Sequence, residues 1–229
     1  MVHSANCNSY DRLQRGRKGN SAATHRCRDL YVKDVDRMKS ELDYPIPAIF
    51  ERVSKRKFTQ QPIAPEMLEQ LLLAATRAPS SGNMQPWEFI VIDEPGKKQE
   101  IVRSTYSGYF SKGKNYQYWI ADAAVVIVAC TNVKRTAARY GPAGAEWAMI
   151  DTAAAVQNLL LTATALGLSG CWVGGINEQA IKESLRIPEY VRIIGLLPIG
   201  YSVEEAAPKS RLPLKWVTHH NSYNVPFYD

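Results

Sequence analysis

Residues 78–87 read Ala-Pro-Ser-Ser-Gly-Asn-Met-Gln-Pro-Trp. Two prolines, one glycine and several short polar side chains are typical of a turn with a rigid backbone. Before this stretch, a helix is predicted from Pro65 to about Ala78, because apolar residues recur on one face: Leu68, Leu71, Leu72 and Ala75. After it, residues 87–93 alternate as a strand does. The sequence therefore predicts a rigid polar loop between a helix and a strand.

Further elements are predicted on both sides of this loop. A short helix is expected at residues 46–54, and an irregular segment at residues 106–119, which are rich in Tyr and Gly. The other predictions are helices at 97–105, 145–166 and 178–185 and strands at 123–129, 169–173 and 191–199. Asn177 is expected to cap the helix at 178–185. Helices outnumber strands, and no internal repeat is visible.

The predicted helix at residues 145–166 is long and apolar. It is closed by Gly167, a common helix terminator, and apolar residues surround almost the whole of its second half. It is interrupted by Asp151, Gln157 and Asn158, whose side chains are costly near the centre of a bilayer. We therefore expect a buried helix and no membrane span, covered on every side by its own domain or by a second subunit.

The chain has 229 residues and a formal net charge of +6, concentrated near its start. Residues 1–40 contain nine basic and four acidic side chains, whereas the rest of the chain is almost neutral. This uneven distribution does not favour nucleic acid or a membrane surface as the partner of the whole protein. We expect a polar basic extension at residues 1–44, with a short helix at 31–42, and a single domain at residues 45–229.

A cytoplasmic location is predicted from the cysteines and from the first residues. Cys130 and Cys171 fall in apolar, strand-like runs, where a packed and reduced thiol is the ordinary state, and Cys7 and Cys27 lie far from them. The first residues also lack the apolar run of a secretory signal.

The sequence lacks the usual patterns of amino-acid catalysis. No nucleophile elbow, Walker-type phosphate loop or pair of histidines at metal-binding spacing lies in the predicted domain. Instead, small, polar and basic residues gather at the ends of elements in three segments: 52–56, 78–87 and 208–211. Arg, Lys and Ser in such segments can donate hydrogen bonds to a phosphate, although each segment alone is equally typical of a solvated loop.

Taken together, the order and spacing of these segments resemble the FMN site of the nitroreductase family. The family pattern opens with Arg-x-Ser-x-Arg or Lys, followed by the loop of residues 78–87 and an apolar helix that ends in Gly-Leu. A Gly-Gly turn and a Lys-x-Arg pair complete it. The matching positions here are Arg52, Ser54 and Arg56; residues 78–87; Gly167 and Leu168; Gly174 and Gly175; and Lys209 and Arg211. The resemblance covers residues 45–221, and the loop is its most specific part.

The resemblance implies a role for each position. The FMN phosphate and its surroundings would be contacted by Arg52, Ser54, Lys209 and Arg211. Arg56 and Asn83 would face the pyrimidine end of the isoalloxazine, where a cation stabilises the anionic reduced flavin. The ring would be lined by Pro79, Ser80 and Ser81, and a backbone N–H of Gly174 or Gly175 would approach N5. Gln85 would contribute to the flavin pocket of a partner subunit.

The resemblance also implies the fold and the activity. The fold would be α+β, with a central, mostly antiparallel sheet, helices on both faces, and an interlocked homodimer around helix 145–166. NADH or NADPH would reduce FMN and leave before a small-molecule acceptor, such as a nitroaromatic, a quinone or a free flavin, takes its place. Neither a catalytic side chain nor a metal is expected, because FMN carries the chemistry.

Other functions remain open at this point. Relatives of the same fold remove iodine from iodotyrosine or fragment a flavin. Ser54 departs from the Arg-x-Asp-x-Arg opening of the flavin-fragmenting group, and residues 106–119 could form the lid that a dehalogenase needs. Another alternative is a non-catalytic flavin-binding regulator whose basic arm contacts nucleic acid, although few aromatic residues accompany the basic ones. A zinc site of His3, Cys7, His25 and Cys27 does not match a familiar ligand spacing.

Overall fold

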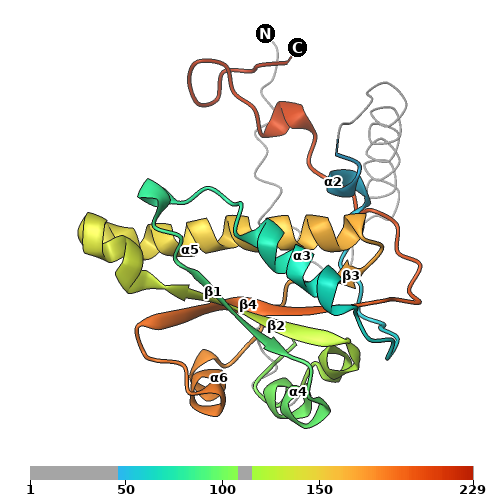
Figure 1. Cartoon of the computed structure of the whole chain (residues 1–229). Helices are drawn as coiled ribbons and strands as arrows, with labels where there is room; N and C mark the ends of the chain where they lie inside the picture. The colour runs from blue at the N-terminus through green and yellow to red at the C-terminus, as the bar shows by residue number, and fades with distance from the viewer. Residues whose placement is uncertain (1–45, 108–114, 229) are drawn as a thin grey trace. The chain divides into compact units, whose positions relative to one another are not determined.

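The computed structural model describes residues 46–107 and 115–228, and a four-stranded sheet lies at the centre of residues 46–208 (Figure 1). The strands follow one another across the sheet in the order β1, β2, β4, β3. Their bounds are Trp87–Ile92 for β1, Val125–Asn132 for β2, Ser169–Gly170 for β3 and Val191–Gly200 for β4. Each neighbouring pair is antiparallel, with Trp87 facing Thr131 and Val125 facing Ile199. The predicted antiparallel sheet is confirmed.

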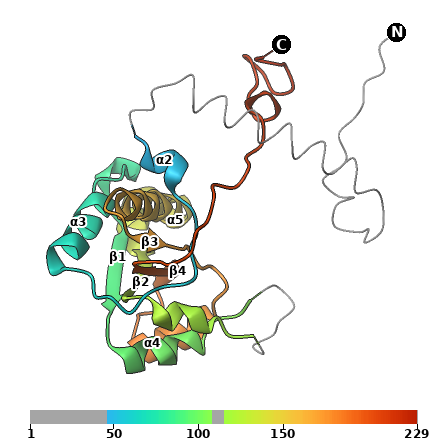
Figure 2. The same cartoon turned by 90° about the vertical axis from the view of Figure 1, so that its right-hand side faces the viewer.

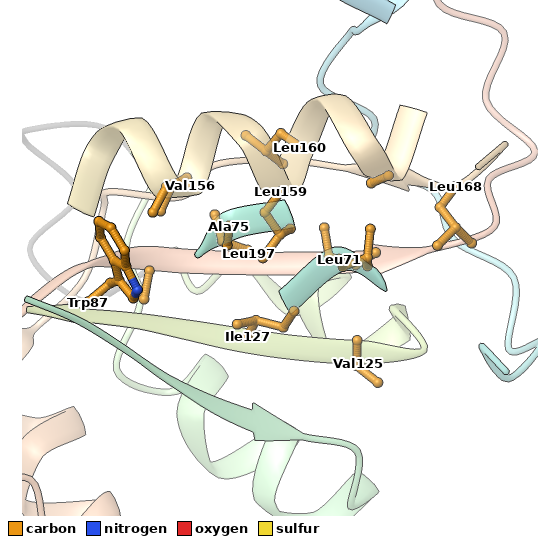
Figure 3. Packing of buried hydrophobic residues seen from close by; sticks show 14 of the residues in the cluster. Leu71, Ala75, Trp87, Val125, Ile127, Val156, Leu159, Leu160, Leu168 and Leu197 are labelled. Carbon is orange, nitrogen blue, oxygen red and sulfur yellow. The ribbon is translucent and has the colours of Figure 1, made fainter. Parts of the chain in front are cut away.

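Helices cover both faces of the sheet, as predicted (Figure 1, Figure 2). α3 (Pro65–Ala75) and α5 (Val133–Ala165) lie on one face, and α4 (Pro95–Val102) and α6 (Glu178–Leu185) lie on the other. Both faces need a covering layer because the apolar side chains of β2, in the middle of the sheet, are buried on both faces of the strand. Ile127 belongs to the same buried cluster as Leu159 of α5 (Figure 3). Val126 packs in the opposite cluster, which contains Ile101 of α4.

α5 differs most from its prediction, because it begins at Val133 and not at residue 145. Gly141 inside it is not helical, with φ 62° and ψ −151°, and Pro142 follows. The helix therefore consists of two segments joined at a glycine–proline break, and such a pair normally signals a helix end. The second segment matches the predicted helix. Within residues 153–165 only Gln157 and Ala165 are exposed, so most of the apolar surface is covered by the same chain.

The other elements agree with prediction to different degrees. α2 (Ala48–Glu51) is shorter than the helix predicted at residues 46–54, because the chain is already extended at Arg52. β3 contains only two of the five residues predicted for it. α6 coincides with its prediction, and the Asn177 side chain accepts a hydrogen bond from the backbone N–H of Ala180 at 3.2 Å, which confirms the predicted cap.

Contacts divide the chain into two units, Ile46–Pro208 and a second one to which residues 209–228 belong. In the second unit, η3 (Leu214–Trp216) is a single 3₁₀ turn, and His219 and Pro226 form an isolated antiparallel bridge. The predictions for the helix at 31–42, the zinc site and the extension at 1–44 fall outside the described residues, and the domain boundary stays a prediction. Among the helices of residues 46–107 and 115–228, none has the length and apolar character needed to cross a membrane.

Candidate functional site

The polar loop of residues 78–87 connects α3 to β1 through a short 3₁₀ turn, η1 (Ser81–Asn83). Three of its residues have a left-handed backbone, with φ of 54° at Gly82, 57° at Asn83 and 47° at Gln85. For residues other than glycine this conformation costs about 1–2 kcal/mol each. The loop therefore needs support from its surroundings to keep this shape.

Part of that support comes from within the loop. The Ser80 hydroxyl accepts a hydrogen bond from the backbone N–H of Gln85 at 3.0 Å. The Gln85 side-chain amide donates to the Asn83 side-chain oxygen at 3.3 Å. Four predicted site residues, Ser80, Ser81, Asn83 and Gln85, thus lie together in one turn.

The rest of the support comes from α5. The Arg135 guanidinium donates to the Gln85 carbonyl at 2.9 Å, and that of Arg139 donates to the Gly82 carbonyl at 3.3 Å. Asp151, which is 8% exposed, accepts hydrogen bonds from both the backbone N–H and the hydroxyl of Ser81. None of these three residues was predicted to belong to the site. The signal was present for Asp151, an acidic residue within an apolar helical run.

The predicted basic segment, residues 52–56, runs beside β3. Ser54 forms a parallel bridge with Gly170, and the backbone N–H of Lys55 donates to the Gly170 carbonyl at 3.4 Å. A Cβ at Gly170 would meet the end of the Ile199 side chain, so a larger residue there would need that side chain to move. The pairing fixes the backbone direction of the segment.

Arg56 is held at two points. Its backbone N–H donates to the Glu204 carboxylate at 2.7 Å, and this bond lowers the pKa of Glu204 below its ordinary value. Its guanidinium lies over the Trp119 ring, 5.8 Å from the centroid, and Trp119 stacks on Phe58 with 6.2 Å between centroids. The exposed guanidinium of Arg56 is thereby kept on the side of its segment that faces Trp119.

The predicted Gly-Gly turn follows an isolated bridge between Val173 and Leu196. A Cβ at Gly175 would overlap the Tyr106 carbonyl, whereas a Cβ at Gly174 would meet nothing within 4 Å. Neither glycine donates its backbone N–H to another of the described residues. A ligand atom could therefore approach these N–H groups at Gly174, which fits the role predicted for this turn.

The basic segment and the polar loop lie toward opposite ends of the second segment of α5 (Figure 1). Ser81 is bonded to Asp151, whereas Ser54 is paired with Gly170 beyond the end of the helix at Ala165. The helix rises 1.5 Å per residue, so the stretch from Asp151 to Ala165 is roughly 20 Å long. The structure therefore does not bring Arg52 and Ser54 together with the predicted ring-lining residues within one chain.

Lys209 and Arg211 belong to the second unit. The Arg211 guanidinium donates to the Lys209 carbonyl at 2.9 Å, and both side chains are exposed. Their predicted contact with the FMN phosphate stays a prediction.

An apolar groove and a buried thiol lie apart from the predicted site residues. An apolar groove of about 740 Å³ lies between α3 and β1, and none of the predicted site residues lines it. Burial raises the pKa of Cys130 to about 12, so this thiol is protonated at neutral pH and is a poor nucleophile. Among the described residues no group of histidine, cysteine and acidic side chains could hold a metal ion.

Comparison with known proteins gives one consistent result. The model of the family described as "Nitroreductase family" matches residues 49–201. An FMN reductase (NADPH) of Bacillus subtilis is 29% identical over 192 residues, which cover 79% of this chain and 74% of the relative. An oxygen-insensitive NADPH nitroreductase of Salmonella typhimurium is 29% identical over 174 residues, 74% of this chain and 70% of the relative.

Solved structures agree with the sequence comparisons. The NADPH:FMN oxidoreductase of Vibrio harveyi, solved with NAD⁺, superimposes with a TM-score of 0.68 at 26% identity, over 78% of this chain and 77% of the other. An FMN-dependent nitroreductase of Clostridium difficile gives a TM-score of 0.64 at 26% identity, over 78% and 99% of the two chains.

Proposed function

This chain belongs to the nitroreductase family, and we propose that it is an NAD(P)H-dependent oxidoreductase that uses FMN. The observation that carries the proposal is the loop of residues 80–85. Its left-handed residues are strained, and hydrogen bonds from α5 hold them in place. Strain of this kind is retained where a fixed geometry serves a ligand.

The residues present fit FMN. Arg52 and Ser54 would supply donors for its phosphate, and the phosphate contacts predicted for Lys209 and Arg211 stay predictions. Pro79, Ser80 and Ser81 would line the ring, with Asn83 and Arg56 at its pyrimidine end. Among the described residues nothing accepts the N–H groups of Gly174 and Gly175, and these groups and the open space at Gly174 suit a planar ring that the backbone must approach closely. When bound, FMN supplies the acceptance and donation of hydride at N5.

In this proposal Arg56 acts through its positive charge. A fixed cation beside the pyrimidine end stabilises negative charge there and so favours the reduced state. Trp119 and Glu204 reduce the number of positions that the Arg56 side chain and backbone can adopt. Less freedom therefore has to be lost when the cofactor binds.

We infer that the working form is a homodimer with flavin sites shared between subunits. The separation of the basic segment and the polar loop along α5 supports this, because a second copy can bring its loop to the basic segment of the first. Exposed apolar residues at α5 and α2 also support it: Trp147 and Ile150 of α5, Ile49 of α2, and Ile46, which precedes α2. Large apolar side chains are commonly exposed at surfaces that a partner covers.

We further propose that the reductant and a small-molecule acceptor use one site in turn, in a ping-pong exchange. Nitroaromatics, quinones and free flavins are the acceptor classes to assay. The buried thiols of Cys130 and Cys171 suit a reducing compartment, and we place the protein in the cytoplasm.

A binding experiment tests the proposal. Purified protein is mixed with FMN, passed through a desalting column, and its visible spectrum is recorded. We expect an equimolar amount of FMN to be retained and to be bleached by NADH or NADPH without oxygen. A protein that retains no FMN after this treatment contradicts the proposed function.

A further inference from the structure

Asp151 uses both of its carboxylate oxygens on one residue of the polar loop. Oδ2 accepts the backbone N–H of Ser81 at 2.9 Å, and Oδ1 accepts its hydroxyl at 3.1 Å. The two residues come from different elements, and Asp151 is 8% exposed within α5. A buried carboxyl group is costly unless it is hydrogen-bonded, and among the described residues these are its hydrogen bonds.

Two other polar residues of α5 make hydrogen bonds outside the polar loop. The Thr152 hydroxyl donates to the Ala148 carbonyl at 2.9 Å, within its own helix. The Asn158 side chain donates to the Ala74 carbonyl of α3 at 3.2 Å and so joins two helices. Of Asp151, Thr152 and Asn158, only Asp151 makes a hydrogen bond to the polar loop.

Asp151 is also the most protected of the anchors that α5 provides. Arg135 and Arg139 bond the loop through exposed side chains, where water competes for the same carbonyl groups. Water competes less for a buried, charge-assisted pair of hydrogen bonds. The anchor lies directly before Gly82 and Asn83, where the left-handed backbone begins.

We propose that Asp151 is a positioning residue for the polar loop of residues 78–87. Through Ser81 it sets the geometry of residues 82–85 before a cofactor binds. The proposal rests on the proposed function for the identity of the ligand. The hydrogen bonds also orient the Ser81 hydroxyl. Since its proton is committed to Oδ1, its oxygen can present only lone pairs to a ligand, and it can accept a hydrogen bond from a ring N–H.

Two readouts test this proposal on the full-length chain. The first is hydrogen exchange of peptides that cover residues 80–88 in the protein without FMN. Asp151→Ala removes both anchors, and we expect exchange at residues 82–85 to become about 10-fold faster or more. The second is the Kd for FMN, measured from flavin fluorescence. We expect it to rise about 10-fold in the same variant, because the loop must then be ordered on binding.

Two further variants separate positioning from general stability. Asp151→Asn can still accept from the Ser81 N–H and, with its amide, donate to the hydroxyl; its Kd for FMN should stay within about 3-fold of wild type. Asn158→Ala is the matched control, because it removes a hydrogen bond of α5 outside the loop. It should lower Tm while loop exchange and FMN affinity stay within about 2-fold.

The outcomes are distinguishable from those that test the proposed function. If wild type retains no FMN, the proposed function fails, while exchange in the FMN-free protein still tests the anchor. If Asp151→Ala exchanges and binds FMN like wild type, the inference is overturned. Should Asp151→Ala not fold, Asp151→Ser replaces it, since its hydroxyl is too short to reach both donors. Wild-type exchange and affinity in that variant would equally overturn the inference.

Discussion

The guanidinium of Arg56 lies 5.8 Å from the centroid of the Trp119 ring, although more than 60 residues separate the two along the chain. Trp119 is itself stacked on Phe58, two residues beyond Arg56. The contact holds the one cation predicted for the pyrimidine end of the flavin. It connects the opening basic segment to η2 (Tyr118–Asp122).

Replacement of Arg56 should slow reduction by nicotinamide. In Arg56→Gln the positive charge that favours the reduced flavin is gone, and we expect kcat/KM for NADH or NADPH to fall about 10- to 100-fold. Arg56→Lys keeps the charge and should lose much less. Trp119→Leu removes the ring but not the charge, so its effect should be smaller than that of Arg56→Gln. Equal rates in wild type and Arg56→Gln would refute the role given to this cation.

Glu204 should stabilise the protein in a pH-dependent way. Its pKa is lowered in the folded protein, chiefly by the hydrogen bond from the Arg56 N–H. Its contribution is therefore present above its ordinary pKa of 4.5 and is lost as the pH falls through the lower folded pKa. Glu204→Gln should lower the free energy of unfolding at pH 7, and urea titrations should show this difference shrinking as the pH falls below 4.5 and through the lowered folded pKa. A difference independent of pH would contradict the assignment.

The two glycines of the Gly-Gly turn should respond differently to substitution. A Cβ at Gly175 overlaps the Tyr106 carbonyl, so Gly175→Ala should lower the free energy of unfolding by about 1–3 kcal/mol. A Cβ at Gly174 meets nothing, so Gly174→Ala should change stability by less than about 0.5 kcal/mol. Gly174→Ala should nonetheless raise the Kd for FMN. Thermal unfolding and flavin fluorescence measure the two effects, and wild-type FMN affinity in Gly174→Ala would remove the turn from the site.

A charge on the outer face of α5 should disrupt the dimer. Ile150 is 67% exposed, and Ile150→Asp would place a carboxylate in the interface proposed there. We expect light scattering to detect a dimer for wild type and a monomer for the variant, with loss of FMN because each site would lack its second subunit. Tyr190→Asp, on a residue that follows α6, is the control and should stay dimeric. A dimeric Ile150→Asp that binds FMN would place the interface elsewhere.

Elements with strong local signals were predicted well. Asn177 caps α6 as its residue type indicates, and β2 is buried on both faces as its apolar run indicates. α5 was predicted only in part, because Gly141 and Pro142 appear as a helix end when neighbouring packing is unknown. Local patterns report the backbone of a short window, so a glycine followed by a proline indicates a helix end whether or not the helix resumes beyond it.

The candidate site shows a similar division. The resemblance indicated Ser80, Ser81, Asn83 and Gln85, and these lie in one turn. It could not indicate that Asp151 anchors that turn, because a contact between residues 70 positions apart depends on how α5 packs over the loop. Spacings along the chain also do not reveal that the loop and the basic segment lie toward different ends of α5. Their positions depend on the path that the helix takes between them.

Anaerobic titration of the FMN-loaded protein tests whether nicotinamide reduces its flavin. NADH or NADPH is added without oxygen while the flavin band is followed, and a nitroaromatic or a quinone is then added. We expect the band to bleach with an equivalent of nicotinamide and to return with the acceptor. A band that nicotinamide leaves unchanged, in protein that holds its FMN, would contradict the assignment as an NAD(P)H-dependent oxidoreductase.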